Sequence, residues 1–312
     1  IPSRYTAAIS GRSGEPLKFF DAVIGGKSVG VPGTPALMLS AHKRWGRLSW
    51  SSLFEPGISL AKSGFRVSPR LSMLVSRDKK HLTQFERTAA YFYPGGNPVK
   101  VGSIMKNLRY ANTLHALASD QGASFYKGEI AKDIVDTVQL ATGNPGRLDL
   151  EDLAGYRVKE RSAVCIAYRD LDVCGMGPPS SGGLTVGQIL GMLENYDLAK
   201  MGPNSSEAWR LIGDASRLAF ADRGRYMADS DFVSVPVKGL LNKKYLNKRA
   251  TLLNQKKALK TVSPGNPSFD TTRTLADDES IELPSTSHIS IVDQYGNALS
   301  MTTTIENAFG SR

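Results

Sequence analysis

Two runs rich in Ile, Val and Thr near the end of the chain constrain its fold more than any other feature. They flank the polar segment Asp293-Gln294-Tyr295-Gly296-Asn297. β-Branched residues favour strands, and a short glycine-containing segment between two such runs is typical of a hairpin turn. Gly296 supplies the positive φ that the last position of a three-residue loop needs. The sequence therefore predicts a β-hairpin in which Thr286 faces Thr304, to within about one residue because of a bulge.

The two faces of this predicted hairpin differ in chemistry, because side chains alternate along a strand. One face carries hydroxyls, an imidazole and a carboxylate, from Thr286, His288, Ser290, Ser300, Thr302, Thr304 and Glu306. The other face carries Ile289, Ile291, Leu299, Met301 and Ile305. Such a set of polar groups is the content of a chemical site. It also fits the solvated face of an edge hairpin, since Thr is a good strand former in any case.

The composition is that of an ordinary globular protein. The chain has 312 residues, of which 41% are hydrophobic and 22% charged. No stretch approaches the roughly 18 to 20 apolar residues of a membrane span, so we expect none. The chain starts at Ile1 and stops at Arg312, after what reads as a strand end or a turn. We therefore expect a piece of a longer polypeptide, in which a signal peptide can be neither seen nor excluded.

The excess of Lys and Arg over Asp and Glu, 39 − 29 = 10, suits nucleic acid, an anionic surface or an acidic substrate. Much of it is local, because residues 232–269 contain no Asp or Glu. Leucines at helical spacing in this segment predict that its lysines form the solvated face of one or two surface helices. No aromatic platform or nucleic-acid motif accompanies the charge, so we expect no nucleic-acid partner.

Cys165 and Cys174 lie on two predicted strands around an Arg169-Asp170 turn. The pairing makes them direct cross-strand neighbours, close enough for a disulfide. A disulfide would imply an oxidising compartment, and two reduced, buried thiols fit the sequence equally well. Cys and His show no metal-ligand spacing, so we expect no metal.

Helical periodicity and turn signals divide the rest of the chain. They predict helices over residues 36–45, 53–61, 103–120, 123–140, 150–155, 184–195 and 206–226. The small residues of Gly177-Pro178-Pro179-Ser180-Ser181-Gly182-Gly183 precede one helix start, where backbone N–H groups suit an anion or carboxylate; an ordinary loop fits as well. Residues 262–285 are rich in Pro, Ser, Thr and acidic side chains, which predicts a flexible segment leading to Thr286.

Several of these motifs together resemble the γ-glutamyltransferase family. The hairpin run Thr286-Ser287-His288-Ile289-Ser290 with Thr302-Thr303-Thr304-Ile305-Glu306 carries the likeness most strongly. Further matches in the same order are Gly30-Val31-Pro32-Gly33-Thr34, Phe125-Tyr126, Asp149-Leu150, Pro178-Pro179-Ser180-Ser181-Gly182-Gly183 and Ala221-Asp222-Arg223. The resemblance implies an N-terminal-nucleophile hydrolase with an α+β, four-layer αββα sandwich that is incomplete in this chain.

The resemblance also implies self-cleavage between Ser285 and Thr286. Residues 1–285 would then be the large-subunit portion of one domain, and 286–312 the start of the small subunit in that domain, giving a heterodimer from one precursor. Ser285, Thr286 and His288 would serve autoprocessing. Thr286 would then be the catalytic nucleophile, oriented by Thr304, with no cofactor. A periplasmic or secreted location is implied.

The implied reaction is attack of the Thr286 hydroxyl on the γ-amide of a glutathione-like substrate, with transfer of the γ-glutamyl group to water or an amine. Substrate contacts would come from Glu306, Thr302, Ser180 and Ser181. Many family members carry Asn where Glu306 stands. Glu306 could pair with the substrate ammonium, or could mark a cephalosporin (glutaryl) acylase, whose acyl group lacks that ammonium. A third hypothesis is an unprocessed, inactive homologue that acts as a binding protein.

Overall fold

The computed structural model describes residues 17–270, 275–277 and 286–312. These residues form two compact units. The hairpin unit consists of residues 17–159 and 286–312, and the disulfide unit consists of residues 160–270 and 275–277. Ser285 and much of the segment predicted to be flexible lie outside the described residues. The sequence-based assignment of residues 1–285 and 286–312 to one domain stays a prediction.

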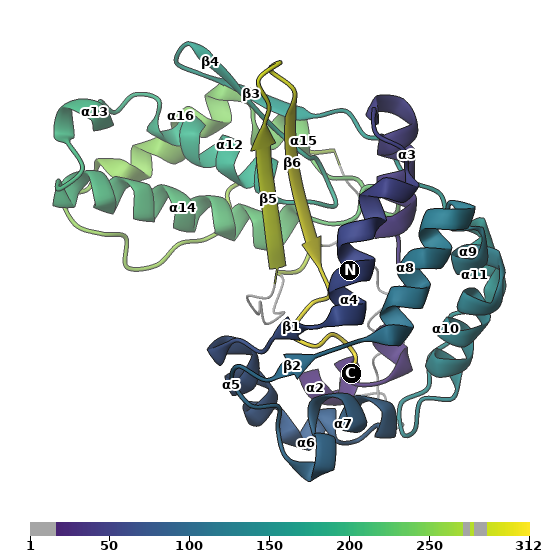
Figure 1. The fold of residues 1–312 in the computed structure, drawn as a ribbon. Helices are drawn as coiled ribbons and strands as arrows, with labels where there is room; N and C mark the ends of the chain where they lie inside the picture. Colours follow the sequence, from purple (N-terminus) through teal and green to yellow (C-terminus); the bar gives the residue numbers. More distant parts are fainter. Residues whose placement is uncertain (1–16, 271–274, 278–285) are drawn as a thin grey trace. The chain divides into compact units, whose positions relative to one another are not determined.

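The hairpin unit is mainly helical and contains two small antiparallel ladders, which Figure 1 shows. Its elements are α2 (Phe19–Val23), η1 (Gly26–Ser28), α3 (Thr34–Trp45), η2 (Ser51–Phe54), α4 (Glu55–Ser63), β1 (Phe65–Arg66), α5 (Pro69–Arg77), α6 (Lys79–Leu82), α7 (Glu86–Phe92), η3 (Pro94–Gly96), β2 (Ile104–Met105), α8 (Leu108–Asp120), α9 (Ala123–Lys127), α10 (Glu129–Gln139), α11 (Leu150–Gly155), β5 (Thr286–Val292) and β6 (Ala298–Thr304).

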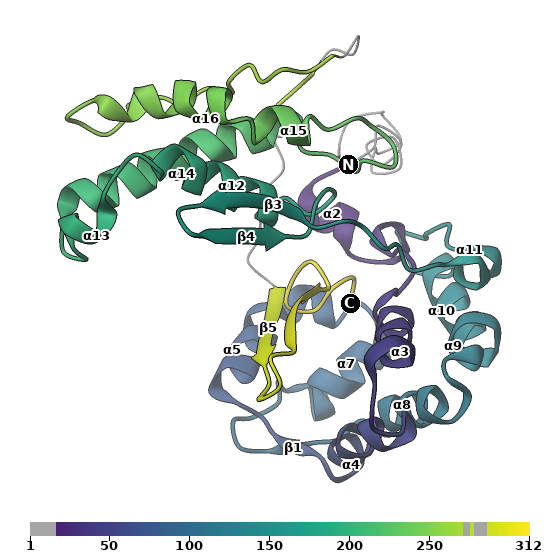
Figure 2. The ribbon, with the colours of Figure 1, turned by 90° about the horizontal axis from the view of Figure 1, so that it is seen from above.

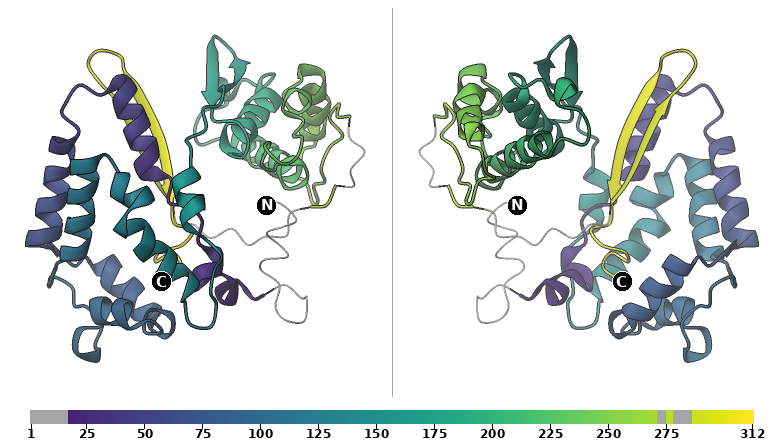
Figure 3. Two further views of the ribbon diagram at one scale, coloured as in Figure 1. Left: turned by 90° about the vertical axis from the view of Figure 1, so that its right-hand side faces the viewer. Right: turned by 90° about the vertical axis from the view of Figure 1, so that its left-hand side faces the viewer.

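The disulfide unit begins with one ladder and continues as helices. Its elements are β3 (Val164–Tyr168), β4 (Leu171–Gly175), α12 (Gly182–Leu193), α13 (Leu198–Met201), α14 (Ser206–Tyr226), α15 (Val237–Leu240), α16 (Lys243–Ala250) and η4 (Thr251–Asn254). Within this unit, α12 packs against α14, α16 and the β3–β4 ladder, an arrangement visible from two sides in Figure 3.

The predicted helices are largely confirmed, with two corrections. Helices α11 and α14 have the predicted bounds, and α4 ends at Gly64 with φ of 92°. The helix predicted from residue 103 begins only at Leu108, because Ile104 and Met105 pair with β1 and the Asn107 side chain caps the new helix start. The helix predicted over 123–140 is broken by extended backbone at Gly128.

Three separate two-stranded antiparallel sheets make up the strand content of the described residues. Helices and strands therefore occur together, as the predicted α+β class requires. The ladders are β1–β2, β3–β4 and β5–β6.

Two tyrosines hold the loop before α3. The Tyr126 hydroxyl donates to the Pro32 carbonyl at 2.7 Å and accepts from the Ala36 N–H at 3.1 Å. Tyr156 stacks on Tyr126 with ring centroids 6.2 Å apart. A Cβ at Gly33 would lie 2.1 Å from the Tyr156 hydroxyl, so only glycine fits there. Residues that are distant in the sequence thus fix the entry to α3.

The chain after β6 is anchored in the hairpin unit. Phe309 packs edge-on against Phe92 at 5.2 Å, beside an apolar cluster of Val67, Val75, Leu82, Tyr93, Val99 and Met105. The Ser311 carbonyl accepts from the Gly25 N–H at 2.9 Å, and Arg312 forms an ion pair with Asp78. Figure 2 shows helices of this unit arranged in an arc around the base of the hairpin. These contacts fix the β6 end of the hairpin.

The disulfide unit is built around a buried carboxylate. Asp222 of α14 is fully buried and accepts four hydrogen bonds. The donors are Gln188 Nε2 at 2.8 Å, the Tyr245 hydroxyl at 2.7 Å, Arg249 Nη2 at 3.0 Å and the Gly265 N–H at 2.7 Å. Burial, followed by the bond to Asp222, raises the pKa of the Tyr245 hydroxyl, which therefore stays protonated and donates. One side chain thus joins α12, α14, α16 and the segment after η4.

The basic segment forms a surface helix, as predicted. The side chains of Lys243, Lys244 and Lys248 on α16 are exposed, whereas Tyr245 and Leu246 are buried. Arg249 in the same helix is also buried, because it pairs with Asp222. Among the described residues, no helix combines the length and the apolar character needed to cross a membrane.

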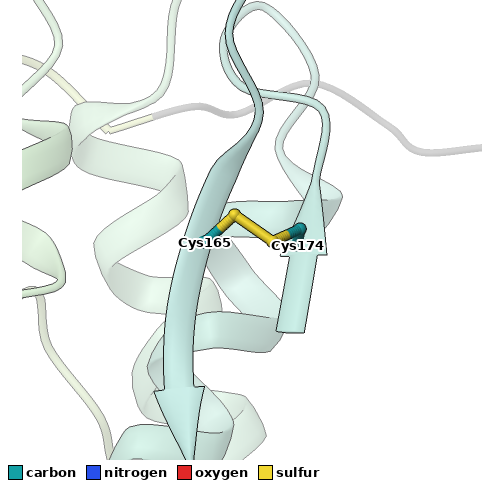
Figure 4. The surroundings of a disulfide bond; sticks show 2 residues. All are labelled: Cys165 and Cys174. Atoms are coloured by element: carbon teal, nitrogen blue, oxygen red, sulfur yellow. A yellow bond between two sulfur atoms is a disulfide. The ribbon is translucent and has the colours of Figure 1, made fainter. Parts of the chain in front are cut away.

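Cys165 and Cys174 are disulfide-bonded, with an S–S distance of 2.03 Å (Figure 4). They face each other in the β3–β4 register, in which Tyr168 pairs with Leu171 across the predicted two-residue turn. Ile166, the residue after Cys165 on β3, is partly buried and packs against the core of the disulfide unit. The two oxidised cysteines are consistent with an oxidising compartment.

Reduction of this disulfide should lower the stability of the protein. Closing a loop of about ten residues restricts the unfolded chain, a contribution of about 2–3 kcal/mol in the chain-entropy description. Both cysteines are exposed, so a reductant reaches the bond in the folded state. Denaturant unfolding with and without reductant measures the change. The Cys165→Ser/Cys174→Ser variant is the control, since its stability should match that of the reduced protein and should not respond to reductant.

Candidate active site

The register of the β5–β6 hairpin is the predicted one. Thr286 pairs with Thr304, His288 with Thr302 and Ser290 with Ser300. These six side chains share one face, since each lies two residues from the next along its strand. The register is unbroken from Thr286–Thr304 to Val292–Ala298, so the one-residue shift that the prediction allowed for does not occur. The sequence-predicted residues Thr286, His288, Thr302 and Thr304 are therefore brought together on one ladder.

The turn that sets this register is held by Asp293. Its carboxylate accepts from the Tyr295 and Asn297 N–H groups, both at 2.9 Å, and from Asn297 Nδ2 at 2.8 Å. The side-chain bond from Asn297, with the two backbone bonds, lowers the pKa of Asp293. Gly296 has φ of 82°, as the loop requires. The turn is thus specified by local side-chain chemistry and places every pair in the ladder.

His288 links three hydroxyls across the polar face. Its Nδ1 lies 2.8 Å from Thr302 Oγ1, and its Nε2 lies 3.0 Å from Ser290 Oγ and 3.2 Å from Ser300 Oγ. A neutral imidazole donates at one nitrogen and accepts at the other, while a hydroxyl does both. The contacts therefore form a continuous hydrogen-bonded chain beside the Thr286–Thr304 pair. Sequence reasoning placed these residues on one face without finding the contacts.

Glu306 departs from the predicted geometry. Strand β6 ends at Thr304, so the alternation of faces does not extend to residue 306. The Asn307 N–H instead donates to the Ile305 carbonyl across Glu306, which has φ of 73°. A non-glycine residue in such a tight turn carries strain of about 1–3 kcal/mol. The placement of Glu306 on the strand face was therefore wrong, because the chain turns about the buried Asn307.

Glu306 nevertheless stays tied to the predicted pair. Its N–H donates to Thr304 Oγ1 at 3.0 Å. The strained turn at Glu306 thus fixes one side of the Thr304 hydroxyl. Backbone strain of this kind gathers at functional sites, which supports a role for the segment and does not identify the ligand.

The opposite face of the hairpin is apolar and exposed. Ile289, Ile291 and Leu299 are 46%, 53% and 48% exposed, although they alternate with the polar residues as predicted. At the tip, the Arg47 guanidinium lies 5.5 Å from the centre of the Tyr295 ring. The hairpin is therefore contacted at its tip by Arg47 and anchored in its unit at the β6 end.

Ser180 and Ser181 belong to the disulfide unit. Ser181 is the residue before the first turn of α12, and its hydroxyl accepts from Arg223 Nε at 2.9 Å. The Ser180 N–H donates to the Gly177 carbonyl at 3.1 Å in the turn around the cis Pro178-Pro179 bond. Arg223 was part of a recognised motif without an assigned role, and this contact supplies one. A substrate role for either serine stays a prediction.

The chemistry available on the hairpin is that of acyl transfer. Hydroxyls and an imidazole serve as nucleophile and proton carriers. Among the described residues, no group of three or more His, Cys, Asp or Glu side chains is arranged to hold a metal.

Comparison with known proteins agrees with the family resemblance found in the sequence. The Gamma-glutamyltranspeptidase family model matches residues 7–312. The chain is 34% identical over 291 residues to the acylase ACY 1 proenzyme of Pseudomonas sp. (strain SE83), which covers 93% of this chain and 49% of the relative. It is also 34% identical over 307 residues to the glutathione hydrolase proenzyme of Bacillus subtilis (strain 168), with 96% and 51% coverage.

Solved structures share the fold. The crystal structure of Helicobacter pylori gamma-glutamyltranspeptidase matches with a TM-score of 0.78 and 32% sequence identity, over 83% of this chain and 74% of that one. The fold implied by the sequence resemblance is therefore confirmed. The chain spans about half the length of the curated relatives it matches.

Proposed function

The chain belongs to the gamma-glutamyltranspeptidase family, and from that premise we propose that the full protein is a self-processing acyl-transfer enzyme with Thr286 as its nucleophile. The observation that carries the proposal is the Thr286–Thr304 pair, set in register by the Asp293 turn and followed along the ladder by the His288 hydroxyl chain. Ordinary strand surface needs none of these contacts. Thr304 serves as the positioning residue, because it lies opposite Thr286 in the ladder and its hydroxyl is itself held by the Glu306 N–H.

Self-processing is the first proposed reaction. The Thr286 hydroxyl attacks the carbonyl carbon of Ser285 and forms an ester as the peptide C–N bond breaks, and the Thr286 nitrogen takes up the proton. Water then hydrolyses the ester. The products are a subunit that ends at Ser285 and a subunit that begins with a free Thr286 amine, and they form the proposed heterodimer.

Turnover uses the new N-terminus. The α-amine, whose ordinary pKa is about 8, accepts the proton of the Thr286 hydroxyl as Oγ1 attacks the γ-amide carbonyl of the substrate. The amine of the substrate leaves with that proton, and a γ-glutamyl ester on Thr286 remains. Water or an acceptor amine resolves the ester. We propose that His288 and Thr302 keep the strand face fixed during both steps.

Glu306 is the proposed determinant of the acyl group. A carboxylate next to Thr304 pairs with the ammonium of a γ-glutamyl substrate through a charge-assisted hydrogen bond. The equal identity to an acylase proenzyme and to a glutathione hydrolase proenzyme favours a second candidate, a glutaryl-type acylase. A glutaryl group lacks the ammonium and gains nothing from Glu306.

The proposed location of the full protein is periplasmic or secreted.

The two candidates are separated by comparing a γ-glutamyl anilide with the matching glutaryl anilide. We expect kcat/KM for the γ-glutamyl compound to exceed that for the glutaryl compound by roughly tenfold to a hundredfold, the value of one charged hydrogen bond. Glu306→Gln should remove most of this preference, while Glu160→Gln in the disulfide unit serves as the control for loss of a carboxylate. A preference for the glutaryl compound identifies the acylase, and no release of either anilide removes both proposals.

A further inference from the structure

The disulfide unit carries a set of exposed lysines in and after α16. We call it the lysine surface, and it consists of Lys243, Lys244, Lys248, Lys256, Lys257 and Lys260. All six lie within a segment, residues 232–269, that contains no acidic residue. Lys243 pairs with Glu194 at 3.4 Å, and the other five form no ion pair with the described residues. Within the part of the chain that the structure describes, ion pairs therefore leave most of this positive charge without a counter-charge.

The chain after α16 returns along α14 and is fixed there. Arg210 donates to the Leu253 carbonyl at 3.0 Å, and the Leu259 N–H donates to Asp214 at 3.2 Å. Arg217 donates to the Leu259 and Lys260 carbonyls. Figure 1 shows this return segment running along α14. The backbone that carries the three lysines of the return segment is thus held in place along α14.

The arginines of this region are used differently from its lysines. Arg249 is buried against Asp222, and Arg210 and Arg217 form ion pairs with Asp214 while they hold the return segment. The charged groups that residues 243–260 expose to solvent are therefore all lysine ammonium groups. Flexible lysine side chains act as point charges and suit a diffuse anionic surface, whereas arginine suits defined phosphate recognition.

We propose that the lysine surface binds an anionic lipid membrane at its periphery. Leu252 is 39% exposed between the two lysine groups and offers a shallow apolar contact. Each lysine near an anionic lipid surface contributes about a factor of five to binding. Tyr245, the aromatic residue of the segment, is buried, so a stacking platform for nucleic acid is missing from residues 243–260. The contact would hold the protein at a membrane surface without a membrane span.

The test is co-sedimentation of the full-length protein with vesicles of phosphatidylcholine alone and with about a third phosphatidylglycerol. Binding should require the anionic lipid and should disappear at about 1 M salt, where the Debye length is about 3 Å. The variant Lys244→Gln/Lys248→Gln/Lys257→Gln should lower the partition coefficient roughly a hundredfold. Its anilide hydrolysis and its Tm should stay unchanged, since these side chains make no described contact.

A matched control separates a local surface from net charge. Lys79→Gln/Lys80→Gln/Lys106→Gln removes the same charge from exposed lysines of the hairpin unit and should change partition by less than about threefold. Equal loss in both variants overturns the proposal, because the net charge alone would then explain the binding. The proposal also fails if the vesicles bind nothing, or if duplex DNA or polyglutamate binds more tightly than the vesicles and with the same dependence on the three lysines.

Discussion

Thr286→Ala should leave the full-length protein as one uncut chain and lower the release of anilide by roughly four orders of magnitude or more. Both effects follow from the same atom, because Thr286 Oγ1 is the proposed nucleophile in self-cleavage and in turnover. Intact mass measured over time after purification reports cleavage, and the new N-terminus identifies the cut. The wild type should give two fragments, one of which begins at Thr286.

Two further variants show whether the hydroxyl, rather than the fold, is responsible. Thr286→Ser keeps a hydroxyl and should still cleave and turn over, more slowly than the wild type. Thr304→Ala should slow both reactions by roughly tenfold to a thousandfold, because it removes an orienting hydrogen bond and leaves the nucleophile in place. Thr303→Ala, on the opposite face of the same strand, should change neither rate. Circular dichroism confirms that each variant is folded.

A wild-type protein that stays a single uncut chain would contradict the proposed self-cleavage. With the alanine variant identical to the wild type in mass and in residual activity, Thr286 would have no chemical role. The hydroxyl chain around His288 would then be a polar strand surface, and the third hypothesis, an inactive binding protein, would replace the enzyme. Cleavage at a peptide bond other than Ser285-Thr286 would likewise remove Thr286 as the nucleophile.

The geometry of the hairpin could be predicted from the sequence because it depends on short-range rules. Alternation of faces follows from the pleat, and the register follows from a turn that Asp293, Gly296 and Asn297 specify locally. The same is true of Cys165 and Cys174, which are paired through a two-residue turn. Strand register can be predicted from the sequence where the residues that fix it lie within one short turn.

Prediction from the sequence failed where contacts with distant residues determine the local structure. The alternation pattern extends to Glu306, yet the strand ends at Thr304 because Asn307 is buried and Phe309 packs on Phe92 far upstream. The role of Ser181 was equally hidden, since its partner Arg223 comes from another helix. Periodicity also extended one predicted helix to residue 103, whereas pairing with β1 takes Ile104 and Met105 into a strand. Tertiary contacts of this kind have no local signature.

Asp222 is the clearest example, and its replacement by Ala should cost about 3–5 kcal/mol of the free energy of unfolding. The loss is large because removal of the carboxylate leaves the Arg249 guanidinium buried without a counter-charge. The Tyr245 hydroxyl, Gln188 Nε2 and the Gly265 N–H lose their acceptor at the same time. Urea unfolding measures the change. Asp277→Ala, which breaks the exposed ion pair with Arg225, is the control and should have little effect.

Variants of Arg249, the ion-pair partner of Asp222, test why Asp222→Ala lowers the free energy of unfolding. If an uncompensated buried charge dominates, Arg249→Met should be as destabilising as Asp222→Ala, and the double variant Asp222→Leu/Arg249→Met should be more stable than either single variant. Tyr245→Phe should cost only about 1 kcal/mol, since it removes one donor of four. Additive losses in the double variant would show instead that the two side chains act separately. Asp222 would then stabilise the unit mainly by accepting the hydrogen bond from the Gly265 N–H, which holds the segment around Gly265 against α14.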